Sequence, residues 1–189
     1  MRIKVVLLFL ISCCFASTIF SQSKKEVKKL KIKSSKVNVV EKVKDKEMSF
    51  QESYEKYDKA GNVVENIEYN KDGTFKKKET RKFNKNDDPT EEIEYDEKGT
   101  PVKKTLTEYN TNKDKTLETV YDGSDKMIEK TQYGYNTKGE KTFELTTDDK
   151  GKTIKKSIYT YDKNSLKIER KTYDGNGDLI MTKKYSYEF

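Results

Sequence analysis

Residues 95–110 read YDEKGTPVKKTLTEYN, and this stretch contains the local signals that decide the fold. Its tetrad 96–99 combines an Asx side chain with a glycine that accepts a positive φ, which favours a tight turn. Residues 100–109 then alternate with period two and carry β-branched and aromatic side chains, as a strand does. Tyr109 and Asn110 begin the same pattern again. The stretch therefore predicts a turn, a strand and a second turn.

The pair of an aromatic residue and an Asp or Asn recurs at alternating intervals of 12 and 14 residues. Its instances are Tyr57-Asp58, Tyr69-Asn70, Phe83-Asn84, Tyr95-Asp96, Tyr109-Asn110, Tyr121-Asp122, Tyr135-Asn136, Tyr161-Asp162 and Tyr173-Asp174, with Thr147-Asp148 filling the one gap and Tyr187 continuing the count. Turns of about four residues leave strands of roughly 8 and 10, so no crossover helix fits and neighbouring strands must be antiparallel. We therefore expect an all-β protein, an antiparallel β-meander of about 11 strands built from repeats of about 26 residues, as a single-layer or coiled open sheet. Pro89 and Pro101 fall where strands are expected to begin.

At Tyr57-Asp58-Lys59-Ala60-Gly61-Asn62 and Tyr173-Asp174-Gly175-Asn176-Gly177-Asp178 the sequence resembles the YD-repeat (RHS-type) family. The resemblance covers about residues 48–189 and suggests a short exported bacterial member. It implies a long antiparallel strip that can coil into a shell, of the kind found in exported toxins, wall-associated proteins and adhesive surface proteins. The chain is short and shows neither the cleavage module nor a toxin domain, so we do not expect a cargo shell.

The first 22 residues have the order of a secretory signal peptide. Arg2 and Lys4 precede an apolar or small run over 5–20, and polar residues follow, with cleavage expected near Ser21 or Gln22. The run is too short and too weakly apolar for a membrane span, so no transmembrane span is expected in the mature chain. A competing signal is Leu10-Ile11-Ser12-Cys13, which resembles a lipobox and would make Cys13 a lipidation site. Both plain export and lipid anchoring stay open.

Composition excludes several chemistries. The chain has no His, and its only two cysteines are Cys13 and Cys14, so a thiol–imidazole pair, a Ser-His-Asp triad and a Cys/His zinc site cannot be built. The formal charge of +7 is concentrated in residues 24–46, which hold ten lysines and three acidic residues. From residue 47 onward 28 basic residues face 30 acidic ones. We therefore expect no nucleic-acid partner, and the basic segment is better suited to anionic lipid or envelope polymer.

These signals divide the chain into three parts: a signal peptide over 1–22, a basic tether and degenerate capping repeat over 23–47, and a repeat sheet over 48–189. Within the second part, residues 23–28 read as a solvated tether. In the sheet, lysines recur five residues before the aromatic residue of the long strands (Lys78, Lys104, Lys130 and Lys156). Glutamates recur three residues before the aromatic position of the short strands (Glu92, Glu118 and Glu144). We expect these lysines and glutamates to pair across neighbouring strands.

Tyrosines form the candidate ligand-binding set. Long strands all end at one rim of the sheet, and in the last three repeats a second tyrosine stands two residues earlier, so it points to the same face. The predicted patch of six rings is Tyr133, Tyr135, Tyr159, Tyr161, Tyr185 and Tyr187. One interpretation is that these rings only pack the sheet. The other is a contact surface for a repetitive glycan or a protein partner.

For function the sequence favours a non-enzymatic exported structural or binding module of the bacterial cell envelope or surface, in contact with an envelope glycan or surface protein. The alternative is a surface lipoprotein of the same fold, anchored through Cys13, and a remote alternative is a glycoside hydrolase that uses a carboxylate pair. The sequence nominates no catalytic residue, no metal ligand and no cofactor. We expect the protein in the periplasm, on the outer surface or outside the cell.

Overall fold

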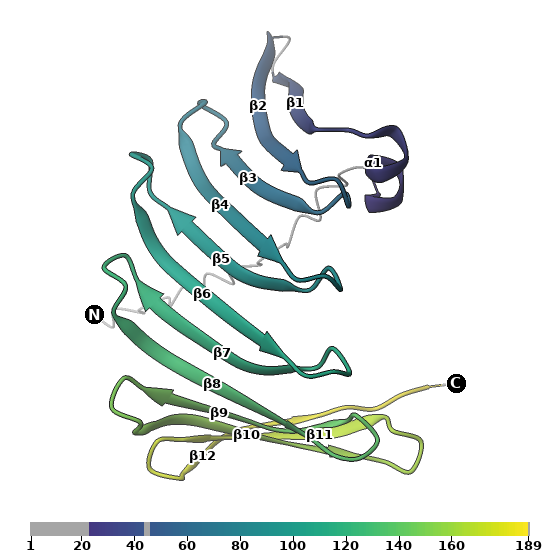
Figure 1. Cartoon of the computed structure of the whole chain (residues 1–189), viewed down its shortest axis with the longest axis vertical. Coiled ribbons are helices and arrows are strands. Elements are labelled where there is room, and N and C mark those ends of the chain that lie inside the picture. Colours follow the sequence, from purple (N-terminus) through teal and green to yellow (C-terminus); the bar gives the residue numbers. More distant parts are fainter. Residues whose placement is uncertain (1–22, 44–45, 189) are drawn as a thin grey trace, which may run out of the picture.

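In the computed structural model, which describes residues 23–43 and 46–188, a short helix is followed by twelve strands that pair in sequence order. Every neighbouring pair is antiparallel, so the sheet is a meander (Figure 1). The elements are α1 (Lys24–Leu30), β1 (Ser34–Val43), β2 (Lys46–Tyr57), β3 (Val63–Tyr69), β4 (Phe75–Phe83), β5 (Pro89–Tyr95), β6 (Pro101–Tyr109), β7 (Lys115–Asp122), β8 (Met127–Tyr135), β9 (Lys141–Asp148), β10 (Thr153–Tyr161), β11 (Lys167–Asp174) and β12 (Leu179–Lys184). The predicted all-β meander is confirmed, with one strand more than the expected eleven. From β2 onward the even-numbered strands are the predicted long strands and the odd-numbered ones are the short strands.

Ten turns of one geometry connect β2 to β12. In each turn the N–H of the Asx residue donates to the carbonyl four residues later, and the N–H of the fourth residue donates back to the Asx carbonyl. The fourth residue has a positive φ in all ten turns, between 61° and 90°. At nine of the turns the Asx Oδ1 also accepts backbone N–H groups, as Asp148 does from Lys150 and Lys152. The turn at Asp148 confirms that Thr147-Asp148 fills the gap in the aromatic repeat.

Every strand pair contains one register shift of a single residue, close to the connecting turn in the pairs from β2 onward. Between β8 and β9, for example, Tyr135 pairs with Lys141 while Gly134 pairs with Phe143. Because side chains alternate with period two, a slip of one residue exchanges the two faces. Up to the bulge, one face therefore carries odd-numbered residues from long strands and even-numbered residues from short strands. Beyond the bulge, the odd-numbered residue that opens the short strand, such as Lys141 opposite Tyr135, shares this face. We call it the packed face, and the other the open face.

This register corrects the predicted pairing of lysine and glutamate columns. Lys104 lies directly opposite Ile93 and Tyr121 on the open face, whereas Glu92 lies opposite Arg81 and Thr105 on the packed face. The two columns therefore point away from each other. The prediction ignored the bulge, which reverses the parity of every second strand. On the open face Lys104 pairs instead with Asp125 and lies 4.9 Å from the centroid of the Tyr121 ring.

Small polar side chains and a few rings supply most of the buried surface. The buried strand residues are Ser53, Tyr57, Glu79, Thr119, Val120, Thr146, Ser157, Tyr159 and Thr172, and all but Thr119 lie on the packed face. Large apolar side chains instead stand on the open face, where Ile128, Phe143 and Ile158 are all exposed. Burial on the packed face thus places hydroxyl groups opposite one another, as in the bond of 3.1 Å between Ser157 and Thr172.

The amino-terminal end is folded where a solvated tether was predicted over 23–28. Ser23 and Glu26 form a capping box that starts α1, and Val27 is only 1% exposed. The helix lies on the first repeat turn, because a Cβ at Gly61 would approach the carbonyl oxygen of Lys24 to 2.7 Å. Lys24 also pairs with Asp87 of the next turn at this rim, at 2.9 Å. A serine followed by glutamate three residues later was the signal for this helix.

The sheet is curved from β1 to β12, and these two end strands do not meet (Figure 1). Of the two forms expected from the sequence, a single-layer or a coiled open sheet, the structure shows one open antiparallel layer that is curved. The predicted signal peptide over 1–22 and the lipidation site at Cys13 lie outside the described residues.

Candidate functional site

The six predicted tyrosines lie together at the end of the packed face formed by β8, β10 and the segment that follows β12. They form two rows. Tyr135, Tyr161 and Tyr187 are the outer row at the ends of the long strands, and Tyr133, Tyr159 and Tyr185 are the inner row two residues earlier. The structure thus brings the predicted residues to one face and one rim.

The outer row holds neighbouring hairpins together. The Tyr161 hydroxyl donates to the backbone carbonyl of Lys141, at 3.0 Å, which is the first residue of the short strand before it. Equivalent bonds span 20 residues each: Tyr109 to Pro89, Tyr135 to Lys115, and Tyr187 to Lys167, at 2.8–2.9 Å. These hydroxyls satisfy carbonyls beside the bulges, where the strand ladder is interrupted. The outer row therefore has a structural role.

The inner row alternates with lysines that open the short strands. The ammonium of Lys141 lies 5.4 Å from the ring centroid of Tyr133 and 4.9 Å from that of Tyr159. Lys167 lies 4.9 Å from the Tyr159 centroid and 5.7 Å from that of Tyr185, and Lys115 lies 5.7 Å from that of Tyr133. Each contact has cation–π geometry. We call the set Lys115, Tyr133, Lys141, Tyr159, Lys167 and Tyr185 the lysine–tyrosine stack.

Acidic residues balance the first two lysines of the stack. Glu118 pairs with Lys115 at 2.5 Å, and Glu144 pairs with Lys141. The corresponding position of the third unit is Arg170, 26 residues after Glu144. Its guanidinium donates to the Ser157 Oγ at 3.2 and 3.4 Å and lies 5.5 Å from the Tyr159 centroid. The stack therefore changes from balanced to cationic toward β12.

The protonation states of Tyr159 and Glu144 are coupled. Burial raises the pKa of Tyr159 well above its usual range, and its hydrogen bond with Glu144 raises it further. Burial works to raise the pKa of Glu144 as well, but hydrogen bonds from Lys141 and Tyr159 outweigh it and leave that pKa lowered. Burial, with the charges of Glu118 and Glu144, also raises the pKa of Tyr133. At neutral pH the tyrosines are therefore neutral donors and Glu144 is ionised.

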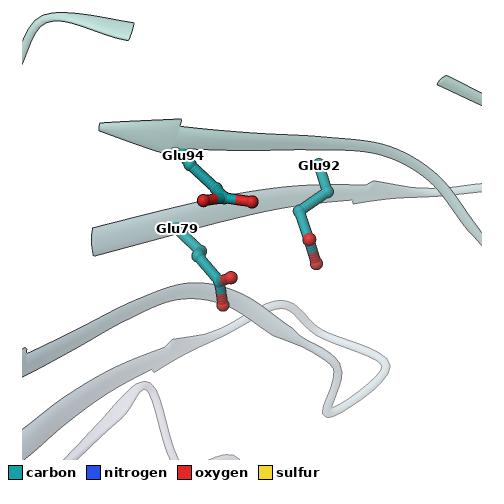
Figure 2. A group of neighbouring side chains, drawn as sticks. All are labelled: Glu79, Glu92 and Glu94. Atoms are coloured by element: carbon teal, nitrogen blue, oxygen red, sulfur yellow. The ribbon is translucent and has the colours of Figure 1, made fainter. Parts of the chain in front are cut away.

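A second cluster lies on the packed face between β4 and β5, where Glu79, Glu92 and Glu94 converge (Figure 2). One carboxylate oxygen of each lies within 4.8 Å of the others, a spacing that could admit a cation. Basic side chains already neutralise all three carboxylates. Glu79 pairs with Lys77 and Arg81, Glu92 with Arg81 at 2.6 Å, and Glu94 with Lys103 at 3.1 Å. The cluster is therefore a balanced ion-pair network that joins β4, β5 and β6.

Sequence reasoning found the tyrosines and missed the lysines between them. The missed residues are Lys115, Lys141, Lys167 and Arg170. The spacing of 26 residues between the three lysines was visible in the sequence. The bulge turns these odd-numbered lysines to the packed face, where Lys141 and Lys167 each lie between rings of the two neighbouring long strands. The acidic cluster was missed for the same reason, because Glu79 and Glu94 have opposite parity and still share a face.

Comparison with known proteins gives similarity to solved structures only. No protein-family model and no curated protein matches the chain. A protein of unknown function from Bacteroides fragilis is 19% identical over 58% of this chain and 93% of its own, with a TM-score of 0.41. A porin-like protein from Bacteroides uniformis is 10% identical over 79% of this chain and 82% of its own, with a TM-score of 0.37.

The chain is also similar to part of a TcdB2–TccC3 assembly, at 10% identity and a TM-score of 0.26. That match covers 82% of this chain and 11% of the assembly chain. The β-repeat fold rests on the strand register and turns described above, and membership of the YD-repeat family stays a prediction. Within the part of the chain that the structure describes, no helix is both long and apolar enough to cross a membrane.

Proposed function

We propose that the protein is a non-enzymatic binding module of the bacterial cell envelope or surface, and that the packed face binds a repetitive glycan along the lysine–tyrosine stack. The observation that carries the proposal is the periodicity of the stack. One lysine and one tyrosine recur every second strand, a spacing of about 9–10 Å. A polymer with a regular chemical repeat can contact several units of the lysine–tyrosine stack at once, so that individually weak contacts add to one stronger affinity.

The chemistry of the row supports this proposal. Tyrosine rings offer flat apolar surface with a polar edge, and they enrich binding surfaces for that reason. The lysines lie against the rings and restrain them, which lowers the entropy lost when a ligand binds. Hydrogen-bond groups that suit sugar hydroxyls stand beside the rings, including the Glu144 carboxylate and the Arg170 guanidinium. Export is supported by the order of residues 1–22 and stays part of the proposal.

Binding to envelope polysaccharide tests the function. The variant carries alanine at Tyr133, Tyr159 and Tyr185, and the matched control carries alanine at Tyr95, Tyr121 and Tyr173, three tyrosines of the open face. We expect retention of the wild type and the control on immobilised envelope polysaccharide, and loss of retention for the first variant, below the melting temperature of all three proteins. Lost stability with unchanged retention would show that the inner row only packs the sheet. Turnover of the polysaccharide would contradict the non-enzymatic part.

Location is a separate question, because Leu10-Ile11-Ser12-Cys13 leaves a lipid-anchored form of the same module as the alternative to plain export. Fractionation with protease treatment of intact cells distinguishes an outer-surface protein from an internal one. Labelling with palmitate separates the two export forms. Incorporation into wild type but not into Cys13→Ala supports the anchor, and no incorporation into either supports free export.

A further inference from the structure

The third unit of the lysine–tyrosine stack differs from the first two in charge. Glu118 and Glu144 neutralise the lysines of their own units, whereas Arg170 adds a second positive charge beside Lys167. On β12, Lys183 lies directly opposite Arg170 and therefore on the same face. Among the ion pairs of the described residues, none involves Lys167 or Lys183. Three cations thus converge where the earlier units are balanced.

Among the described residues, one carboxylate lies within ion-pair distance of this group. Glu144 lies 3.6 Å from the Arg170 Nη2, and it also pairs with Lys141. The remaining Arg170 contacts are to the neutral Ser157 hydroxyl and to the Tyr159 ring. These contacts use Nε and Nη2, and no described residue accepts a bond from Nη1. The guanidinium is therefore held in place with donors left for a ligand.

Tyr185, the last ring of the stack, is also its most exposed ring. Tyr133 and Tyr159 each have a lysine ammonium at two sides, and Tyr159 is only 7% exposed. Tyr185 has Lys167 alone, because no further strand follows β12 within the described residues, and 36% of it is exposed. A bond of 3.0 Å from the Tyr185 N–H to the Ile168 carbonyl fixes its backbone. The site therefore offers an aromatic surface next to three cations.

We infer that Lys167, Arg170, Lys183 and Tyr185 form a binding site for a uronic acid unit of an acidic polysaccharide, an inference that rests on the proposed glycan-binding function. Arg170 and the two lysines bind the carboxylate, and the sugar ring lies against Tyr185. Nucleic acid suits the surface less, because its affinity depends on many phosphate contacts. From residue 47 onward the chain holds 28 basic and 30 acidic residues, so the positive charge is local.

The test uses the full chain and three probes: polygalacturonate as the uronic acid polymer, dextran as a neutral polysaccharide, and an oligothymidylate as a non-carbohydrate polyanion. Arg170→Glu gives the third unit the charge pattern of the first two and is therefore expected to fold. Lys183→Glu is a second variant at an exposed position. Lys156→Glu is the matched control, because it makes the same charge change at an exposed lysine of the open face.

We expect polygalacturonate to bind the wild type, and each of Arg170→Glu and Lys183→Glu to weaken that binding at least tenfold. Lys156→Glu should change the affinity for polygalacturonate less than twofold, and added salt should weaken that binding.

Unchanged affinity in a folded Arg170→Glu or Lys183→Glu protein would overturn the site. Equal binding of oligothymidylate would also overturn it, since the patch would then select charge alone. Dextran binding as tightly as polygalacturonate would overturn the acidic-sugar inference while leaving glycan binding intact, and failure of every polysaccharide would remove both proposals.

Discussion

At the scale of single residues, the αL position of each turn determines how well the chain reverses direction. Six of the ten turns have glycine there, and the other four have Asp87, Lys113, Asp125 and Ser165 with φ between 61° and 68°. A side chain at such a φ crowds its own backbone. The free-energy cost of this αL conformation is smaller for Asp than for lysine. Lys113 is therefore the residue least suited to the αL conformation among these four.

Two opposite substitutions test this account. Lys113→Gly should raise the free energy of unfolding by about 0.5–1 kcal/mol, because it removes the strain of the αL conformation. Gly139→Ala should lower it by about 1 kcal/mol. A Cβ at Gly139 meets nothing within 4 Å, so its effect comes from the backbone alone. Urea denaturation measures the free energy of unfolding of both variants. Lys138→Gly is the control and should destabilise the protein. A less stable Lys113→Gly protein would contradict the account.

At the scale of strands, the bulge beside each turn decides which residues meet. It turns the tyrosines of long and short strands to opposite faces, and it brings Lys141 between two rings of neighbouring long strands. The same irregularity leaves carbonyls without ladder partners, and the hydroxyls of Tyr109 and of the three outer-row tyrosines bond to four of them. Outer-row tyrosines therefore compensate for the bulges that create the site.

Removing one outer-row hydroxyl should cost about 1 kcal/mol of unfolding free energy, the usual net value of a hydrogen bond. We expect this loss for Tyr161→Phe, with a fold otherwise intact, since Phe83 occupies the same position of an earlier repeat. The control is Tyr173→Phe on the open face, whose hydroxyl forms no bond to a described residue, and its stability should not change. Equal stability of Tyr161→Phe and wild type in urea denaturation would show that the bond is replaced by water.

At the scale of the whole molecule, each strand forms ladder hydrogen bonds only with its neighbours, so stability depends on local pairs more than on a central core. The two ends of the sheet are not equivalent. α1 packs on the first turn and buries Val27, whereas all six residues of β12 are exposed. An uncovered end strand opens more readily than an interior one.

Hydrogen exchange should reveal this asymmetry. We expect β12 amides to exchange first, β2 and β3 to exchange more slowly, and β5 to β8 to be protected longest. Val27→Asp should accelerate exchange in β2 and β3 because it places a charge under the helix. Val40→Asp, at a valine that is 64% exposed, is the control and should leave that region unchanged. Uniform exchange along the sheet would show that the meander opens as one unit.

The sequence alone determined the repeat, the turns, the antiparallel meander and the rim on which the six tyrosines lie. These features depend on residues within five positions of one another, such as Asp96 and Gly99, and on the alternation that follows. Only the tertiary structure decided which faces the charged columns occupy, that the helix over 24–30 packs on the first turn, and that lysines stand between the tyrosines. The physical reason is the register: one bulged residue per strand pair reverses every facing relation beyond it, and local sequence does not show how many residues the ladder skips.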